Sequence, residues 1–195
     1  MAEFLDEDAK QSIDNAKDLV VDSLAETMDL YGVTRSAGTL YGTMYFEGDM
    51  TLDEMRDQLG MSKPSMSTGV KKLQDFNVVK KTFRKGQRKH TYVAERDFFR
   101  FFANFFSYKW EREVDMNLEA IRTAQNQLAD IIASENLSAE VIQEAQETYD
   151  ILEQSKPYYY WLQRLAAMVK SGEIFDIIPF YPMNEEEDYG TGEQR

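Results

Sequence analysis

The sequence has no cysteine, a single histidine and no long apolar segment, and each absence narrows the possible functions. Without cysteine, the chain forms no disulfide, zinc-thiolate site or thiol redox switch. No stretch approaches the ~20 apolar residues that are needed to cross a bilayer, and the N-terminus is acidic rather than apolar. These features predict a cytoplasmic protein that neither spans a membrane nor is secreted.

Catalytic chemistry also has few candidates in this sequence. His90, the single histidine, lies among basic and β-branched residues, which favours packing or phosphate contact over a role as a base. The sequence contains no glycine-rich phosphate loop, nucleophile elbow or metal-ligand spacing. We therefore expect a protein that is not an enzyme and that needs no metal or cofactor.

Positive charge is scarce in the whole chain but concentrated in one segment. The formal net charge is −13 over 195 residues, which by itself argues against binding nucleic acid. Residues 62–92, however, contain nine basic residues and one acid, so this segment carries a charge of +8. A positive face on an acidic body is typical of a protein that binds DNA in one orientation. On charge alone, a solvated lysine-rich hairpin is the alternative.

Helix-start signals predict a helix-turn-helix at the beginning of this basic segment. Thr51 and Glu54 have the spacing of a capping box, which predicts a helix over residues 52–59. A glycine ends that helix, and the pair Ser62 and Pro64 has the cap and first-turn pattern that begins the next one. The result is a helix, a tight turn and a second helix.

The second of these helices has two different faces. Met66, Val70 and Leu73 share one face and are expected in the core, and Gly69 beside them allows close approach to the preceding helix. The opposite face carries hydroxyl groups near the N-terminal end and cations further along, which suits a phosphate-lined groove. From this helix we expect DNA contacts by Ser62, Lys63, Ser65, Ser67, Thr68, Lys71 and Lys72.

Two β-rich stretches, residues 78–83 and 89–93, enclose a glycine-containing basic loop at 84–88. They predict a β-hairpin wing with a cationic tip. The expected fold class is therefore mainly α with a small β wing: a winged helix-turn-helix on a helical dimerisation scaffold. From the wing we expect DNA contacts by Arg84, Lys85, Arg88 and Lys89.

Helical periodicity flanks the winged module on both sides. After Arg96 the pattern predicts a long helix to about Glu135, a second helix from Ser138 to Ser155 and a third that begins at Pro157. The predicted divisions of the chain are a flexible N-terminus (1–11), N-terminal helices (12–46, with helices at 12–31 and 34–46), the DNA-binding domain (47–95), a C-terminal dimerisation and effector-sensing region (96–182) and a disordered acidic tail (183–195).

The segments described above resemble the GbsR family within the MarR-like winged-helix repressors. The most specific blocks are MSKPSMSTGVKKLQ (61–74) and VVKKTFRKGQRKHTYVAE (78–95), and the resemblance extends over roughly residues 12–180. It implies a homodimeric repressor that binds a double-stranded DNA operator and controls osmoprotectant genes, for glycine betaine synthesis or choline import. It also implies release from the operator by a quaternary ammonium effector such as choline.

A surplus of aromatic residues near residue 100 fits that implied ligand. A quaternary ammonium group cannot donate a hydrogen bond, so proteins hold it by cation–π contacts in a box of rings. The rings of residues 98–110 cover roughly half of a helix circumference, more than the stripe of ~100° that packing requires. The alternative is that these rings form the dimer interface and the seam under the wing. The candidate effector-binding residues are Tyr41, Tyr45, Phe102, Phe106 and Trp110.

The same aromatic residues predict a two-fold homodimer, because one long helix with so many rings has no other way to bury them. A separate cluster at residues 158–161 is expected mainly in the dimer core. Two alternatives share the DNA-binding prediction: an architectural DNA-binding protein, and a MarR-like repressor that responds to a different ligand or to none. Both would differ only at the proposed ligand pocket.

Overall fold

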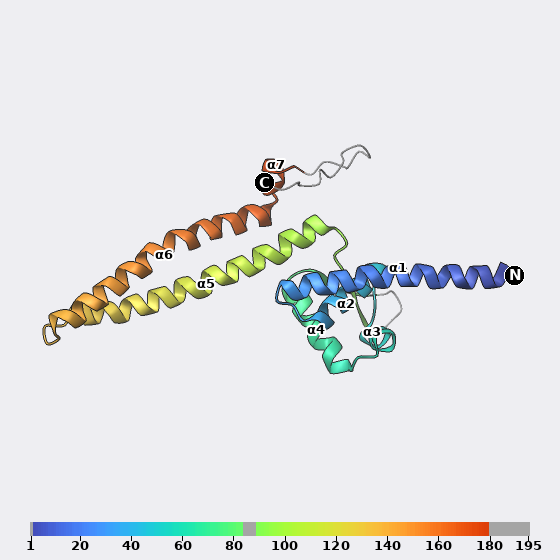
Figure 1. Ribbon diagram of the computed structural model, residues 1–195, viewed down its shortest axis with the longest axis horizontal. Coiled ribbons are helices and arrows are strands. Elements are labelled where there is room, and N and C mark those ends of the chain that lie inside the picture. Colours follow the sequence, from blue (N-terminus) through green and yellow to red (C-terminus); the bar gives the residue numbers. More distant parts are fainter. Residues whose placement is uncertain (1, 84–88, 180–195) are drawn as a thin grey trace, which may run out of the picture. The chain divides into compact units, whose positions relative to one another are not determined.

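The computed structural model describes residues 2–83 and 89–179, and it confirms the expected class, mainly α with a small β wing (Figure 1). Contacts divide the chain into two compact units, residues 1–112 and 113–195. The elements are α1 (Ala2–Leu30), α2 (Arg35–Glu47), α3 (Leu52–Leu59), α4 (Lys63–Asp75), β1 (Val79–Phe83), β2 (His90–Ala94), α5 (Phe98–Ile132), α6 (Ala139–Ser171) and α7 (Ile174–Ile177).

The helix-turn-helix forms as its capping signals predict. The Thr51 hydroxyl accepts a hydrogen bond from the Glu54 amide at 3.2 Å, and the Glu54 carboxylate accepts one from the Thr51 amide at 2.6 Å. Gly60 closes α3 in the left-handed conformation at φ +63°, which glycine adopts without a steric penalty. The Ser62 hydroxyl then caps α4 by accepting from the Ser65 amide. Local capping interactions therefore determine both ends of α3 and the start of α4.

Helices α1 and α2 approach so closely that two positions on α2 require glycine. A Cβ added to Gly38 would lie 2.7 Å from the Ala25 Cα atom, and one added to Gly42 would lie 3.1 Å from the Val21 Cα atom. Such separations are shorter than normal contact distances between carbon atoms. The small residues on α2 therefore bring its backbone directly against α1.

The core of the first unit lies between α2, α4, the wing and the start of α5. Met66, Val70 and Leu73 of α4 are buried in it, as predicted. The prediction that Gly69 allows approach to the preceding helix is wrong. Its nearest neighbours are Leu40 and Ala37 of α2, because this side of α4 packs across α2 rather than against α3.

The wing is an antiparallel pair with Val79 opposite Ala94 and Phe83 opposite His90. A third segment joins its edge, since the Met50 amide donates to the Tyr92 carbonyl at 2.9 Å and the Tyr92 amide donates to the Met50 carbonyl at 2.8 Å. This bridge ties the wing to the residue just before α3. The predicted cationic tip, residues 84–88, lies outside the described residues.

Helix α1 begins at Ala2, well before the predicted start at residue 12. Side chains 5–16 are all exposed, so this half of the helix has no dense apolar stripe for periodicity to detect. It consists largely of Ala, Glu, Asp, Lys and Gln, several of which are strong helix formers. Helix propensity rather than burial accounts for the extra turns.

The predicted break near Pro157 is also wrong, because α6 continues through this residue from Ala139 to Ser171. A proline inside a helix removes one amide donor and crowds the preceding turn. On its C-terminal side, however, α6 buries Leu162, Ala166 and Val169. We attribute the continuity of the helix to this packing, which outweighs one missing hydrogen bond.

The second unit is a helical hairpin formed by the later part of α5 with α6, which Figure 1 shows running side by side. Gln125 is 6% exposed, and its amide donates to the Glu153 carboxylate at 2.9 Å, which fixes the pairing of the two helices. Within the described part of the chain, no helix is both long and apolar enough to cross a membrane.

Candidate nucleic-acid interface

The outward face of α4 carries the predicted mixture of hydroxyls and a cation. Ser67, Thr68 and Lys71 are exposed, whereas the opposite side of the helix is buried in the core. Since the core fixes the rotation of α4 about its axis, these three side chains are held on the solvent side. An exposed arc of short donors and a cation can contact base edges and phosphates together.

The N-terminal end of α4 is occupied by hydroxyl groups that bind one another. The hydroxyl oxygens of Ser62 and Ser65 are 2.8 Å apart, and the Ser62 hydroxyl also caps the helix. Ser62 therefore has a structural role in addition to its predicted DNA contact, and both serines are exposed to a ligand.

Lys63 and Lys89, both predicted DNA contacts, are joined by a carboxylate. Asp53, in the first turn of α3, lies 3.1 Å from the Lys63 ammonium and 2.7 Å from the Lys89 ammonium. Hydrogen bonds from Lys89 and then Lys63 lower the pKa of Asp53 to about 2. The sequence analysis missed this residue because its position in the first turn of α3 was explained by the capping pattern alone. We name these three residues the Asp53 clamp.

Lys72, another predicted DNA contact, has a hydrogen-bond partner within the chain. Its ammonium group donates to the Gly32 carbonyl at 3.3 Å, and the side chain is only partly exposed. Lys109 of α5 donates to the neighbouring Tyr31 carbonyl and lies 5.4 Å from the centre of the Phe105 ring. Two lysines from different helices thus bind adjacent carbonyls at the end of α1, where the helix dipole is negative.

In the described part of the wing, one of the two lysines on β1 forms an ion pair. Lys80 lies 3.5 Å from the Glu95 carboxylate, while Lys81 is exposed. At the last described pair, the 69% exposed ring of Phe83 meets His90 edge-on at 4.7 Å. The predicted contacts Arg84, Lys85 and Arg88 lie outside the described residues.

Tyr41 and Tyr45 are placed in the winged unit beside the start of α5. Tyr41 is 1% exposed, and its hydroxyl donates to the Glu95 carbonyl at 2.6 Å. Burial raises the pKa of this phenol. Its ring lies 5.1 Å from Phe101, and the ring of Tyr45 stacks on Phe98 at 5.4 Å. Tyr41 is therefore a core residue with a satisfied hydroxyl, and Tyr45 is the more accessible of the two.

The other three predicted effector residues follow one another along α5. Phe106 lies 5.1 Å from Phe102 and 5.4 Å from Trp110, and all three rings are partly exposed. Tyr31 adds a ring to this group, 5.1 Å from Phe106 and edge-on to it. The five predicted residues thus form two groups, which are connected through the stacked rings of Phe101 and Phe105.

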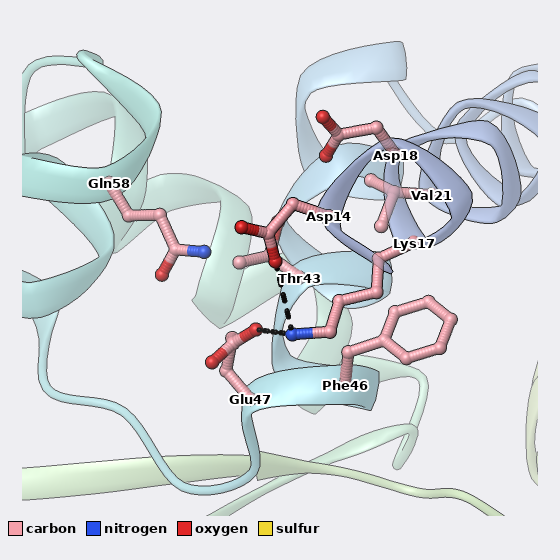
Figure 2. A pocket seen from close by; sticks show the side chains of 8 residues that line it. All are labelled: Asp14, Lys17, Asp18, Val21, Thr43, Phe46, Glu47 and Gln58. Carbon is pink, nitrogen blue, oxygen red and sulfur yellow. Dashed lines mark hydrogen bonds and ion pairs between the residues drawn. The ribbon is translucent and has the colours of Figure 1, made fainter. Parts of the chain in front are cut away.

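The first unit also has a polar hollow of about 470 Å³ beside α1 and α2. In Figure 2 the Lys17 side chain extends from α1 toward Glu47, with the Lys17 ammonium 3.1 Å from the Glu47 carboxylate and 3.6 Å from that of Asp14. These acidic walls do not suit DNA. Among the described residues, no group of three or more His, Asp or Glu side chains could hold a metal ion.

Known proteins similar to this chain are transcriptional regulators. The family described as "GbsR family transcriptional regulator, C-terminal helical hairpin" matches residues 98–176. The HTH-type transcriptional repressor GbsR of Bacillus subtilis (strain 168) is 64% identical over 168 residues, which cover 86% of this chain and 93% of that protein. The HTH-type transcriptional repressor OpcR of the same strain is 30% identical over 168 residues, with coverages of 86% and 91%.

A crystal structure of a transcriptional regulator aligns with a TM-score of 0.44 and 18% identity, over 75% of this chain and 95% of the other. The expectation of a regulator rather than an enzyme is confirmed by the two repressor sequences. With 64% identity over most of both chains, this protein belongs to the GbsR family of transcriptional regulators.

Proposed function

We propose that this protein is a DNA-binding repressor in which α4 enters the major groove and the wing contacts the backbone. The observation that carries the proposal is the exposed arc of Ser67, Thr68 and Lys71 on a helix whose other face is fixed in the core. In winged helix-turn-helix proteins the second helix reads base edges, whereas cations elsewhere hold the phosphates. The two repressors similar in sequence support the same function.

Within this proposal, the hydroxyl and cationic groups have separate roles. Ser65, Ser67 and Thr68 contact bases or adjacent phosphates, and Lys71 contacts the backbone. The wing residues Arg84, Lys85 and Arg88 add backbone or minor-groove contacts. This assignment follows from residue chemistry, because short hydroxyls reach base edges only from a helix that lies in the groove.

The proposal includes a homodimer that binds two half-sites. Tyr158, Tyr160 and Trp161 on α6 are between 49% and 57% exposed, which leaves a large aromatic surface in contact with water in a single chain. A second copy related by two-fold symmetry would cover this surface in both subunits. Two recognition helices would then contact half-sites about one helical turn apart, ~34 Å.

A quaternary ammonium effector such as choline is the proposed release signal. The support is chemical, since Phe102, Phe106 and Trp110 form a partly exposed series of rings, and ring faces attract such cations. To release DNA, the ligand must bind more tightly to the conformation that cannot hold the operator. By reciprocity, operator DNA weakens ligand binding by the same factor.

The DNA-binding part is tested first with the unmodified protein. Genomic fragments are selected for binding, and fluorescence anisotropy then compares the best fragment with a scrambled duplex of the same length across a series of salt concentrations. We expect Lys71→Ala to weaken both duplexes and to lower the salt slope by about one unit, whereas Thr68→Ala changes sequence preference. Lys10→Ala, on the exposed half of α1, is the control and leaves both unchanged. A native protein that prefers no fragment would refute the proposal.

The effector part is tested by titrating choline into the protein and into its complex with the selected fragment. Phe106→Ala and Trp110→Ala are expected to weaken choline binding and choline-triggered release together. Leu19→Ala, which removes a 74% exposed apolar side chain from α1, is the control. If the native protein binds the fragment but choline neither binds nor releases it, the alternative of another ligand or none is correct.

A further inference from the structure

The Asp53 clamp joins three elements that the proposed DNA surface needs in a fixed arrangement. Asp53 lies in the first turn of α3, Lys63 is the first residue of α4, and Lys89 directly precedes β2. The carboxylate binds both ammonium groups, at 3.1 and 2.7 Å, through different oxygen atoms. One side chain therefore connects the start of the proposed recognition helix to the loop end of the second wing strand, β2.

The clamp also reduces the positive charge that this surface offers to phosphate. Without Asp53, Lys63 and Lys89 would present two ammonium groups beside a recess of about 240 Å³, which Thr51, His90 and Tyr92 also line. Two ammonium groups around a recess of this size make a general anion site. With the carboxylate between them, much of their attraction for a phosphate is already satisfied, because the carboxylate competes for the same donors.

The lysines are still accessible from outside. The side chain of Asp53 is 24% exposed, whereas those of Lys63 and Lys89 are 58% and 69% exposed. A DNA phosphate can therefore approach each lysine from solvent while Asp53 still binds it. DNA of the correct shape and register meets both lysines, while arbitrary DNA meets a surface of reduced charge.

We propose that Asp53 determines DNA specificity by holding Lys63 and Lys89 in one arrangement and lowering their attraction for the phosphates of arbitrary DNA. This inference rests on the proposed DNA-binding function and deepens it. It assigns to an acidic residue on the DNA-facing side a role against non-specific binding, which is mainly electrostatic. A role in stability alone would be small, since exposed ion pairs contribute little to the free energy of unfolding.

Asp53→Asn is the direct test, with Asp57→Asn as the matched control. Asp57 lies on the same short helix and undergoes the same change of charge, but its carboxylate binds Arg56 at 2.6 Å rather than a lysine of the clamp. Arg56 also lies 3.7 Å from the Asp53 carboxylate, so both variants loosen the same arginine and only Asp53→Asn releases the two lysines. We expect Asp53→Asn to steepen the salt slope for a scrambled duplex by about one unit, because one further phosphate contact becomes available. Over a four-fold change in salt this corresponds to ~4-fold in Kd, and binding of the selected fragment should tighten less or weaken.

Lys89→Gln provides a test that leaves Asp53 in place. Because Asp53 already satisfies part of the Lys89 charge, this substitution should lower the salt slope for scrambled DNA by less than Lys71→Ala does. In the double variant Asp53→Asn, Lys89→Gln, the slope gained by the single aspartate change should disappear. Circular dichroism and thermal unfolding verify that each variant is folded, and Asp53→Asn should unfold close to the native temperature.

Two results would overturn the inference while leaving the proposed function in place. In one, Asp53→Asn and Asp57→Asn change scrambled-duplex binding equally, which reduces the effect to net charge. In the other, Asp53→Asn weakens both duplexes by the same factor, which makes the clamp a structural support only. Failure of the proposed function would be seen earlier, as a native protein without preference for any fragment, and the inference would fall with it.

Discussion

Gly38 on α2 is the position where a single methyl group should most disturb the first unit. An ideal Cβ atom there would lie 2.7 Å from the Ala25 Cα atom and 3.0 Å from the Ala25 carbonyl oxygen of α1. Both neighbours are backbone atoms in the middle of a helix, so neither can rotate away. Gly38→Ala therefore requires α1 and α2 to separate along their shared face.

The size of the effect follows from two opposing terms. Carbon atoms pack favourably at about 3.5–4.0 Å, so the helices must separate by roughly 1 Å at this point. Overpacking of this kind destabilises by about 1–3 kcal/mol. Alanine regains up to ~1 kcal/mol through its higher helix propensity. Because the 2.7 Å contact is with backbone atoms that cannot rotate away, the upper end of the overpacking range applies, and the expected net loss in the free energy of unfolding is about 2 kcal/mol.

Urea unfolding followed by tryptophan fluorescence measures this loss. Trp161→Phe provides a background in which Trp110 reports on the first unit, and all variants are compared at one protein concentration. At Gly42 the added Cβ meets Val21 at 3.1 Å, and at Gly69 it meets the flexible end of Leu40 at 3.2 Å. We expect destabilisation in the order Gly38→Ala, Gly42→Ala, Gly69→Ala. A Gly38→Ala protein as stable as the native one would refute the reasoning.

Three further predictions test other parts of the structure. Tyr41→Phe removes the donor to the Glu95 carbonyl from a buried side chain and should lower the free energy of unfolding by about 1–2 kcal/mol in urea titration, while the same change at half-exposed Tyr160, Tyr160→Phe, should not. In the proposed homodimer, Trp161→Arg would place a charge in the interface and should shift the mass from dimer to monomer in light scattering at micromolar concentration; an unchanged mass would exclude α6 from the interface. The pKa of Asp53, lowered to about 2 from 3.8 by hydrogen bonds that include Lys89, implies that the clamp's stabilisation is complete above pH ~4 and is lost as the pH falls to ~2. A carboxyl NMR titration should show that low midpoint, and a higher one in Lys89→Gln.

The elements of the DNA-binding module could be predicted because their signals are local. The capping box at Thr51 and the cap at Ser62 act over three residues, so the sequence contains both partners side by side. The alternation of the wing strands and the apolar face of α4 are also readable within one element. For the same reason the start and end of α3 and the start of α4 agreed with the structure to within a residue.

The partners of these elements could not be predicted in the same way. Gly69 was expected against the nearest preceding helix, but it packs on α2, which depends on how three helices assemble. The clamp joins residues that are ten and thirty-six positions apart from Asp53, a distance at which sequence order gives no pairing information. Pro157 shows the reverse case, since a strong local breaker was overridden by packing further along α6.

The aromatic surplus of α5 was visible in the sequence, but its division into core and surface was not. Helical spacing places Phe101 and Phe105 on one side, and the structure buries both against the winged unit. Tyr41 is taken into the same core because its hydroxyl finds the Glu95 carbonyl. A ring count therefore overestimates how many aromatic side chains a ligand could reach.

The burial of these rings places the start of α5 within the winged unit itself. Phe105 lies 4.7 Å from Phe76, the residue that ends α4, and on its other side it contacts Phe106, one of the proposed effector residues. A ligand bound beside Phe106 would therefore be one ring away from a residue that touches the recognition helix. Because interiors are close-packed, a shift of Phe105 cannot be absorbed locally. The rings of Phe106, Phe105 and Phe76 thus connect the proposed effector site to the end of α4 within the first unit.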